Sequence, residues 1–281
     1  MSSHRIIRGL LLAFIVAVIS VSTGCSGKRD RNESPCLVTL WPDPGFYPTG
    51  NSSLWFCDGI KLNSQWSFGR FDRKSVVDYP VSKSTNAIYL WCNITAKTEV
   101  DINDKKLISD GTGCDSLYCS SIFFDSGQES LRSEMKMQRM YARLFVGITG
   151  FDEKEVPVKI RVKGTTKGYY VDKSLVMGGT TFEVMPLVNS KGSLPEIRDT
   201  VDFSVNIIKQ ENLSGLEMTV YFSSGMGKTL PIGKILKNYG AEESAGDDFF
   251  KDYHVVINMV HGTITIGILK WEKEMIFETE F

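Results

Sequence analysis

The sequence predicts an all-β protein made of two antiparallel β-sandwich domains and one short helix. Many short segments alternate apolar and polar residues with a period of two, as in strands with one face in a core. Segments rich in Gly, Asn, Asp and Ser separate them and are typical of turns. Apolar residues recur at helical spacing in one segment. The 281 residues are 42% hydrophobic and 11% aromatic, enough for one or two packed cores.

Residues 1–24 are predicted to be a lipoprotein signal peptide. His4, Arg5 and Arg8 precede an apolar run at 10–19, which is too short to span a membrane because spanning needs about 20 residues. The following VSTGC, at 21–25, resembles the lipobox of bacterial lipoproteins. The resemblance implies cleavage before Cys25 and acylation of Cys25 with lipid chains such as palmitate, which attach the protein stably to a membrane. The alternative is a soluble secreted protein with a cysteine near its cleavage site.

The mature chain is expected to begin with a tether at 25–35, because residues 26–34 contain no apolar side chain to bury. Ser26 follows the lipidated cysteine, and a residue other than Asp there resembles the outer-membrane sorting pattern of diderm bacteria. A polar stretch at 128–138 marks the boundary between the domains. We therefore expect an N-terminal β-sandwich at 36–130 and a C-terminal β-sandwich at 131–281.

The strands of the C-terminal domain are predicted by alternation, most clearly at 156–163, where Val156, Val158, Ile160 and Val162 alternate with Pro and basic residues. Four further segments show the same pattern through Val201, Phe203, Val205 and Ile207; Leu216, Met218, Val220 and Phe222; Tyr253, Val255, Ile257 and Met259; and Ile264, Ile266 and Ile268. A strand is also expected at 141–148.

The N-terminal domain contains one clear two-faced strand. Ile88, Leu90, Cys92 and Ile94 are expected on one face, and Tyr89, Trp91, Asn93 and Thr95 on the other. The predicted helix lies at 231–240, where Ile232, Ile235, Leu236 and Tyr239 have helical spacing between Pro231 and Gly240.

Five cysteines remain after Cys25, an odd number in a compartment that permits disulfides. A local disulfide between Cys114 and Cys119 is possible because both lie in a Gly-rich, polar stretch, whereas Cys92 is expected to be a buried thiol. The mature chain has only His254 and His261 to supplement the thiols, and it has no paired CxxC spacing. We expect no metal site and no cofactor.

The sequence lacks the motifs of common enzymes. The segment GMGKT at 225–229 ends like a phosphate loop, but Phe222 stands where that loop needs glycine, so a hairpin turn is expected and no nucleotide. Residues 101–104 are interpreted as a strand-end turn and not a calcium loop. His261 is placed in a hairpin turn, and the carboxylates at 247–248 in a solvated loop. The formal net charge of −1 gives no basic surplus for nucleic acid.

Tryptophans raise an alternative function, because exposed aromatic rings can stack on sugars. Trp91 is the best candidate for exposure, although it could equally cover the second side of a sheet. A glycan-binding surface lipoprotein of a polysaccharide-uptake system would need several of these residues grouped on one exposed face: Trp41, Trp55, Trp66, Trp91 and Trp271.

Several segments together resemble the FimB-type minor-fimbrium anchor subunits, lipoproteins of type V (donor-strand) fimbriae, and closely related uncharacterised lipoproteins. The resemblance is carried by the lipobox, by a short helix at 230–240, and by three strand-like segments: PCLVTL at 35–40, MYARLFVGI at 140–148 and ITIGILKW at 264–271. Residues 42–74 match this family poorly.

The resemblance implies two transthyretin-like sandwiches and no enzymatic activity. It also implies a surface-exposed position on the outer membrane, where the protein anchors a fimbrial shaft, with possible control of shaft length. The expected partners are fimbrial shaft or accessory subunits, bound by β-strand addition. The candidate donor is the C-terminus, where Met275, Phe277, Thr279 and Phe281 share one face of an extended chain. The alternative is a native final strand of the second sandwich.

Overall fold

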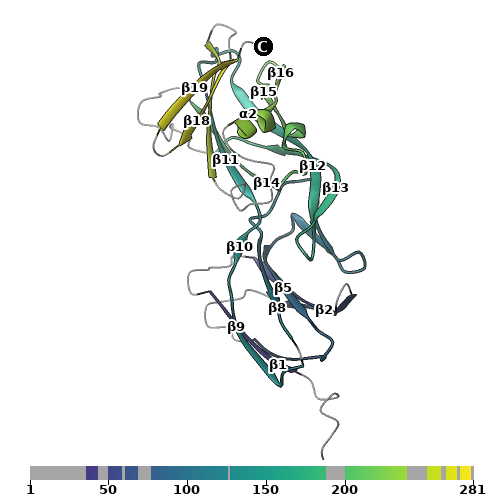
Figure 1. Cartoon of the computed structure of the whole chain (residues 1–281). Coiled ribbons are helices and arrows are strands. Elements are labelled where there is room, and N and C mark those ends of the chain that lie inside the picture. Colours follow the sequence, from purple (N-terminus) through teal and green to yellow (C-terminus); the bar gives the residue numbers. More distant parts are fainter. Residues whose placement is uncertain are drawn as a thin grey trace, which may run out of the picture.

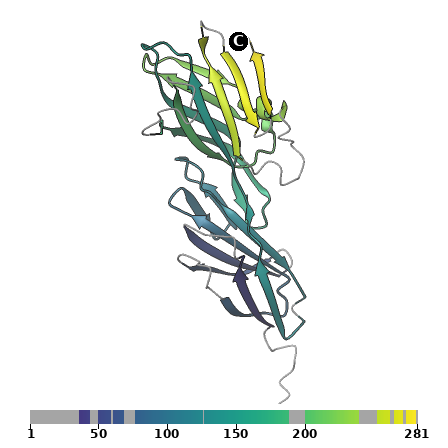
Figure 2. The ribbon, with the colours of Figure 1, turned by 90° about the vertical axis from the view of Figure 1, so that its left-hand side faces the viewer.

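The computed structural model describes residues 36–43, 50–58, 61–68, 77–125, 127–187, 200–238, 252–260, 264–270 and 273–279. These residues form an all-β fold, which confirms the predicted fold class. Two β-sandwiches are stacked end to end (Figures 1 and 2). Strand β1 lies at one end of the molecule, and strands β18 and β19 lie at the other.

The first sandwich has a three-stranded and a five-stranded sheet. The three-stranded sheet contains, in spatial order, β4 (Val77–Val81), β1 (Cys36–Pro42) and β9 (Ser130–Met135). The five-stranded sheet contains β10 (Gln138–Arg139), β8 (Tyr118–Phe123), β5 (Ala87–Ile94), β2 (Asn51–Asp58) and β3 (Lys61–Phe68). The core between them includes Val38, Leu40, Leu54, Phe56 and Leu90.

The second sandwich also has two sheets. One contains β14 (Val201–Ile207), β11 (Ala142–Thr149), β17 (Asp252–Asn258), β18 (Ile264–Lys270) and β19 (Lys273–Thr279). The other contains β16 (Gly227–Leu230), β15 (Glu217–Phe222), β12 (Pro157–Tyr170), β7 (Lys106–Ser109) and β6 (Thr98–Asp101), with β13 (Leu175–Val184) also paired to β12. Although most pairs are antiparallel as expected, β1 pairs with β9 and β11 with β17 in parallel.

Strand pairing does not follow the linear order of the chain. Hairpin β6–β7 lies before residue 130, yet β7 pairs with the end of β12 in the second sandwich. Conversely, β9 and β10 lie after Glu129 and pair with strands of the first sandwich. We retain the division into two domains near Leu131 as a proposal. Across this boundary, β7 pairs with the second sandwich, and β9 and β10 pair with the first.

The expected core positions of β14, β15 and β17 are confirmed, since Phe203, Val205, Met218, Val220 and Ile257 are buried. One alternation fails at Val158, which is 37% exposed while Pro157 is buried. The reason is a register shift between Pro157 and Lys159 opposite β15, which leaves Val158 as an extra residue in the strand.

A second alternation fails at Ile94, which was expected beside Leu90 and Cys92. Asn93 has a φ of 65° and stands at a register shift between β5 and β2, so the strand gains one residue there. Ile94 consequently joins the cluster that contains Trp91, on the other side of the sheet.

The predicted helix is confirmed as α2 (Ile232–Asn238), which buries Ile232 and Leu236, while Tyr239 and Gly240 lie outside the described residues. It packs against the short 3-10 helix η1 (Leu213–Gly215), whose N-cap is Asn212. The approach is close, because a Cβ on Gly233 would lie only 1.6 Å from the carbonyl oxygen of Leu213. Glycine is therefore required at this position.

A buried junction joins the two sandwiches. The indole Nε1 of Trp91 donates to the carbonyl oxygen of Val171 at 3.0 Å, and its ring lies 5.5 Å from that of Tyr169. The Tyr169 hydroxyl donates to the carbonyl oxygen of Met140 at 2.7 Å and accepts from the Lys209 N–H at 3.1 Å. One hydrophobic cluster therefore continues from the first sandwich into the second.

Candidate partner-binding site

The C-terminal strand is the candidate partner-binding site, and the structure places three of its four predicted residues on β19. β19 is the edge strand of its sheet and pairs with β18 in antiparallel register. Met275 is opposite Ile268, Phe277 opposite Ile266 and Thr279 opposite Ile264. Phe281 and the predicted lipidation site Cys25 lie outside the described residues.

Strand β18 connects this edge to the core. Ile266 is buried and belongs to the main hydrophobic cluster, beside Ile257 of β17. In the structure β19 is hydrogen-bonded to its own chain, in the arrangement of a native final strand. An edge strand held through one neighbour has one row of backbone groups free for another chain. The role of β19 as a donor therefore stays a proposal.

The two cysteines considered for a disulfide are both buried free thiols in the structure. Burial raises the pKa of Cys114 to about 12 and also raises the pKa of Cys119. Cys92, expected to be buried, is fully so and accepts a hydrogen bond from Ser52 Oγ at 3.3 Å. The bridge between Cys114 and Cys119 stays a prediction, which alkylation without reduction followed by mass measurement would test.

Of the two alternatives for Trp91, exposure is wrong, and cover of the second side of the sheet is confirmed. Trp91, the residue favoured for exposure, is 0% exposed, and Trp55 is 1% exposed. Both are covered because the second face of β5 and β2 packs into the junction between the sandwiches. Trp41 is 36% exposed. The side chain of Trp66 and all of Trp271 lie outside the described part of the chain.

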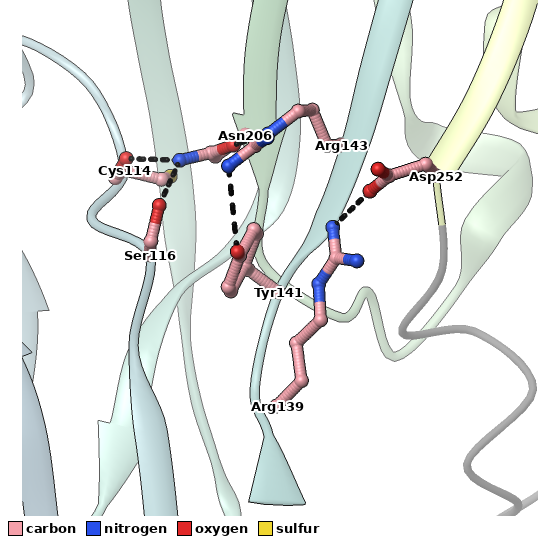
Figure 3. Close-up of polar contacts among 7 residues, drawn as sticks. All are labelled: Cys114, Ser116, Arg139, Tyr141, Arg143, Asn206 and Asp252. Atoms are coloured by element: carbon pink, nitrogen blue, oxygen red, sulfur yellow. Dashed lines mark hydrogen bonds and ion pairs between the residues drawn. The ribbon is translucent and has the colours of Figure 1, made fainter. Parts of the chain in front are cut away.

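A polar network lies beside the junction (Figure 3). The Asn206 Nδ2 of β14 donates to the carbonyl oxygen of Cys114 at 3.3 Å and to Ser116 Oγ at 3.0 Å. Arg143 of β11 donates from Nε to Asn206 Oδ1 at 3.3 Å and from Nη2 to the Tyr141 hydroxyl at 3.4 Å. The network therefore ties the 114–116 segment of the first sandwich to two strands of the second.

Arg139 extends the same row of side chains. Its guanidinium pairs with Asp252 at the start of β17 (Figure 3) and lies 4.0 Å from the centre of the Tyr141 ring. Further along β11, the Phe145 ring stacks on His254 at 4.9 Å. This row was not predicted from the sequence, although basic and aromatic residues alternate at positions 139, 141, 143 and 145.

A cavity of about 350 Å³ adjoins the network. It is bounded by the 112–114 segment, by the end of β13, and by β14, the edge strand opposite β19 in its sheet. Its lining includes Lys97, Gly113, Arg143, Glu183, Ser204 and Asn206.

The rejected motifs have ordinary structural roles where they are described. GMGKT forms the turn and start of β16 in the β15–β16 hairpin, and Asp101 caps the β6–β7 turn by accepting from the Asp104 N–H. His261 and residues 247–248 lie outside the described residues. Within the described ranges, no group of three or more His, Cys, Asp or Glu could hold a metal, and no helix is long and apolar enough to cross a membrane.

No family model and no curated protein matches the sequence of the chain. Its fold does match solved structures. A candidate polysaccharide-binding protein from Bacteroides thetaiotaomicron is 10% identical, with a TM-score of 0.63 over 87% of this chain and 98% of that one. A candidate adhesin from the same organism is 11% identical, with a TM-score of 0.58 over 83% of this chain and 96% of that one.

The fimbrial anchor protein Mfa2 from Porphyromonas gingivalis is also similar. It is 14% identical, with a TM-score of 0.60 over 87% of this chain and 99% of that one. At such low identities the matches establish the fold alone. The chain therefore shares its fold with these three proteins over 83–87% of its length.

Proposed function

We propose that this chain is a surface-exposed outer-membrane lipoprotein that anchors a fimbrial shaft and contributes to limiting the length of the shaft. The proposal is carried by the similarity of the fold to the fimbrial anchor protein Mfa2, which extends over 99% of that protein. The fold, the lipobox at 21–25 and the expected tether together support an extended protein with a membrane attachment at one end. The proposal includes no enzymatic activity.

The arrangement of the ends supports this role. β1, which follows the tether, lies at the opposite end of the molecule from β19 (Figures 1 and 2). A lipid on Cys25 would therefore hold the first sandwich at the membrane and direct the β18–β19 edge away from it. The hydrophobic cluster around Trp91 is continuous between the two sandwiches. It would therefore let a pulling force pass from the first sandwich to the second.

We propose β-strand addition as the contact with the shaft. A shaft subunit with an open sheet edge would accept residues 273–281, with backbone hydrogen bonds setting the register and Met275, Phe277, Thr279 and Phe281 filling its pockets. Release of β19 from β18 would leave Ile266 at the new edge of the sheet, so an exchange would need to compensate for the lost pairing.

A pull-down from outer membranes of the native host tests the anchor role. The bait is the full chain, compared with a chain truncated after Trp271, and with Phe277→Ser and Ile276→Ser variants. Because Phe277 is on the donor face and Ile276 on the other, donation predicts that Phe277→Ser loses fimbrial subunits while Ile276→Ser retains them. Equal recovery with all four baits would discard the donor but keep the anchor; recovery of no fimbrial subunit by the full chain would overturn the anchor.

Lipidation is tested separately by labelling cells with a palmitate analogue. We expect Cys25→Ser to abolish the label and to release the protein from the membrane fraction, while the neighbouring Ser26→Ala retains both. A labelled Cys25→Ser protein would show that the lipid is elsewhere.

Burial of Trp55 and Trp91 weakens the alternative of a tryptophan-lined glycan surface. One of the similar proteins is a candidate polysaccharide-binding protein, but a sugar-binding role here would need a different site.

A further inference from the structure

Polar and charged side chains line the cavity between the 112–114 segment and β14. Its volume of about 350 Å³ is at the small end of ligand pockets, which measure about 300–1,000 Å³. It lies at the edge of the sheet away from β19, so it is separate from the proposed donor strand.

The charges in this cavity favour an anion. Lys97 and Arg143 contribute two cations, and Glu183 contributes the carboxylate. Glu183 already binds Lys159 Nζ at 2.9 Å and Arg161 Nη2 at 2.6 Å, and these two contacts lower its pKa. The charge of the lining carboxylate is therefore balanced by two cations of β12.

The nearby carboxylates do not bond to Arg143, although Asp110 interacts electrostatically with Lys97. Asp110 accepts from the N–H and the hydroxyl of Thr112, both at 2.7 Å. Asp115 accepts from the N–H of Thr95 at 2.8 Å and from its hydroxyl at 2.6 Å. Asp252 pairs with Arg139. An anionic ligand would therefore compete with no carboxylate bonded to Arg143 among the described residues.

Neutral groups fix the position of the Arg143 guanidinium. Asn206 Oδ1 and the Tyr141 hydroxyl each accept one of its hydrogen bonds (Figure 3), and its guanidinium lies 5.7 Å from the centres of the Tyr141 and Phe145 rings. These bonds use two of the five N–H donors of a guanidinium, whose planar geometry suits a carboxylate. Such an arginine binds an anion without first breaking an ion pair.

The remaining lining suits hydroxyl groups. Ser204 and Asn206 line the cavity from β14. At this edge the Leu187 N–H bonds to the carbonyl oxygen of Asp202 at 2.8 Å. Because backbone groups alternate along a strand, those of Ser204 and Asn206 point to the same side as that of Asp202. The Asn206 amide is already bonded to Cys114, Ser116 and Arg143, so the groups of β14 offered to a ligand are the Ser204 hydroxyl and the backbone, beside the apolar side chains of Phe182 and Met185.

We infer that this cavity binds a sugar carboxylate, such as a uronic acid unit of a glycan, with the carboxylate on Arg143 and Lys97 and the hydroxyls on β14. The volume accommodates a ligand of roughly monosaccharide or disaccharide size. A small inorganic anion would use the two cations but leave the β14 groups unused. This inference does not depend on the fimbrial role, because it involves no residue of β19.

Isothermal titration of the full chain in detergent tests the site with D-glucuronate as the probe. D-glucose and acetate are the matched probes that lack, respectively, the carboxylate and the ring hydroxyls. We expect glucuronate to bind measurably. Acetate and glucose should bind at least tenfold more weakly, because acetate lacks the ring hydroxyls and glucose lacks the carboxylate.

Variants assign the binding to the cavity. Arg143→Gln should weaken glucuronate binding about tenfold or more, through loss of a charge-assisted hydrogen bond. Lys97→Gln should weaken glucuronate binding by a smaller factor. Among the described residues Lys97 forms no ion pair within 4 Å, so this variant is expected to fold. Lys163→Gln, which removes an exposed charge on β12, is the control and should bind like the unmodified chain. Absence of glucuronate binding, equal binding of all three probes, or binding unchanged in both Arg143→Gln and Lys97→Gln would each overturn the proposal.

Discussion

Strands β5 and β11, one in each five-stranded sheet, differ in how many faces they bury. In the first sandwich all eight residues of β5 are buried, because one face packs on β1 and the other on the junction with the second sandwich. In the second sandwich β11 alternates, with Leu144, Val146 and Ile148 in the core and Arg143 and Phe145 half-buried on the outer face. Strand β5 is therefore covered on both faces, whereas β11 has one partly exposed face.

A strand whose residues alternate along the sequence can therefore have either one buried face or two. In β11 the outer positions include Arg143, whose side chain is only partly buried. In β5 the second face has Tyr89 and Trp91, aromatic residues with one polar group each, and that face is covered. A polar group there needs a defined partner, which Trp91 finds in the carbonyl oxygen of Val171. Burial of both faces of β5 ties the sandwiches together, while the outer face of β11 stays partly exposed.

The largest predicted loss of stability comes from removing a large side chain on the covered face of β5. Trp91→Ala should lower the free energy of unfolding by about 3–5 kcal/mol, because it leaves a cavity and removes the hydrogen bond to Val171. Urea unfolding measures the change. Trp41→Ala, at the 36% exposed tryptophan of β1, is the matched control and should cost clearly less. Equal losses in the two variants would mean that the junction contributes little stability.

The next effect concerns the hairpin that crosses between the sandwiches. A Cβ on Gly168 would lie 2.0 Å from the carbonyl oxygen of Leu107, so Gly168→Ala should push β7 away from β12 and cost about 1–3 kcal/mol or more. Hydrogen exchange at the amides of β7 should accelerate. Gly179→Ala is the control, because its nearest neighbour would be 4.0 Å away. Unchanged exchange in Gly168→Ala would contradict the close pairing of β7.

Alkaline pH should weaken the first sandwich through its buried thiols. Burial raises the pKa of Cys92 from 9.0 to about 12. Below about pH 9 the thiol is protonated in both states; above it, the unfolded chain loses a proton that the folded chain keeps, so unfolding is favoured. At pH 10 this linkage amounts to about 1 kcal/mol for Cys92. Urea midpoints at pH 8 and pH 10 measure it, and the loss should be smaller in Cys92→Ala. An equal loss in that variant would assign the effect to other groups.

The smallest effect is expected from the ion pair on the outer side of the junction. Asp252→Asn removes the partner of Arg139, and both side chains are partly exposed, so the cost should be about 0.2–1 kcal/mol. Added salt should reduce the difference from the unmodified chain, because it screens the pair. A cost well above this range, insensitive to salt, would mean that the pair clamps the β10–β11 connection more strongly than its exposure indicates.

Local pattern predicted much of the fold. The alternation at Phe203 and Val205, at Met218 and Val220, and at Val255 and Ile257 places the right side chains in the core. The prediction was wrong at Val158 and Ile94, where an extra residue shifts the register. A register shift depends on the neighbouring strand, which no pattern within one segment contains. The row from Arg139 to Phe145 was visible in the sequence, but its partners Asn206 and Asp252 come from distant strands.

Local sequence patterns predicted strands β5, β11, β12, β14, β15, β17 and β18, the helix α2 and most of their apolar faces. They did not predict β2, β3, β4, β8, β9 or β13. The predicted properties depend on side chains within a few residues of one another, so a single segment contains the information. Tertiary structure alone decided that β7 joins the second sandwich, that Trp91 is buried, and that Arg143 meets Lys97 around one cavity. Those outcomes depend on contacts between residues far apart in the chain, and burial is a property of the assembled layers rather than of any one strand.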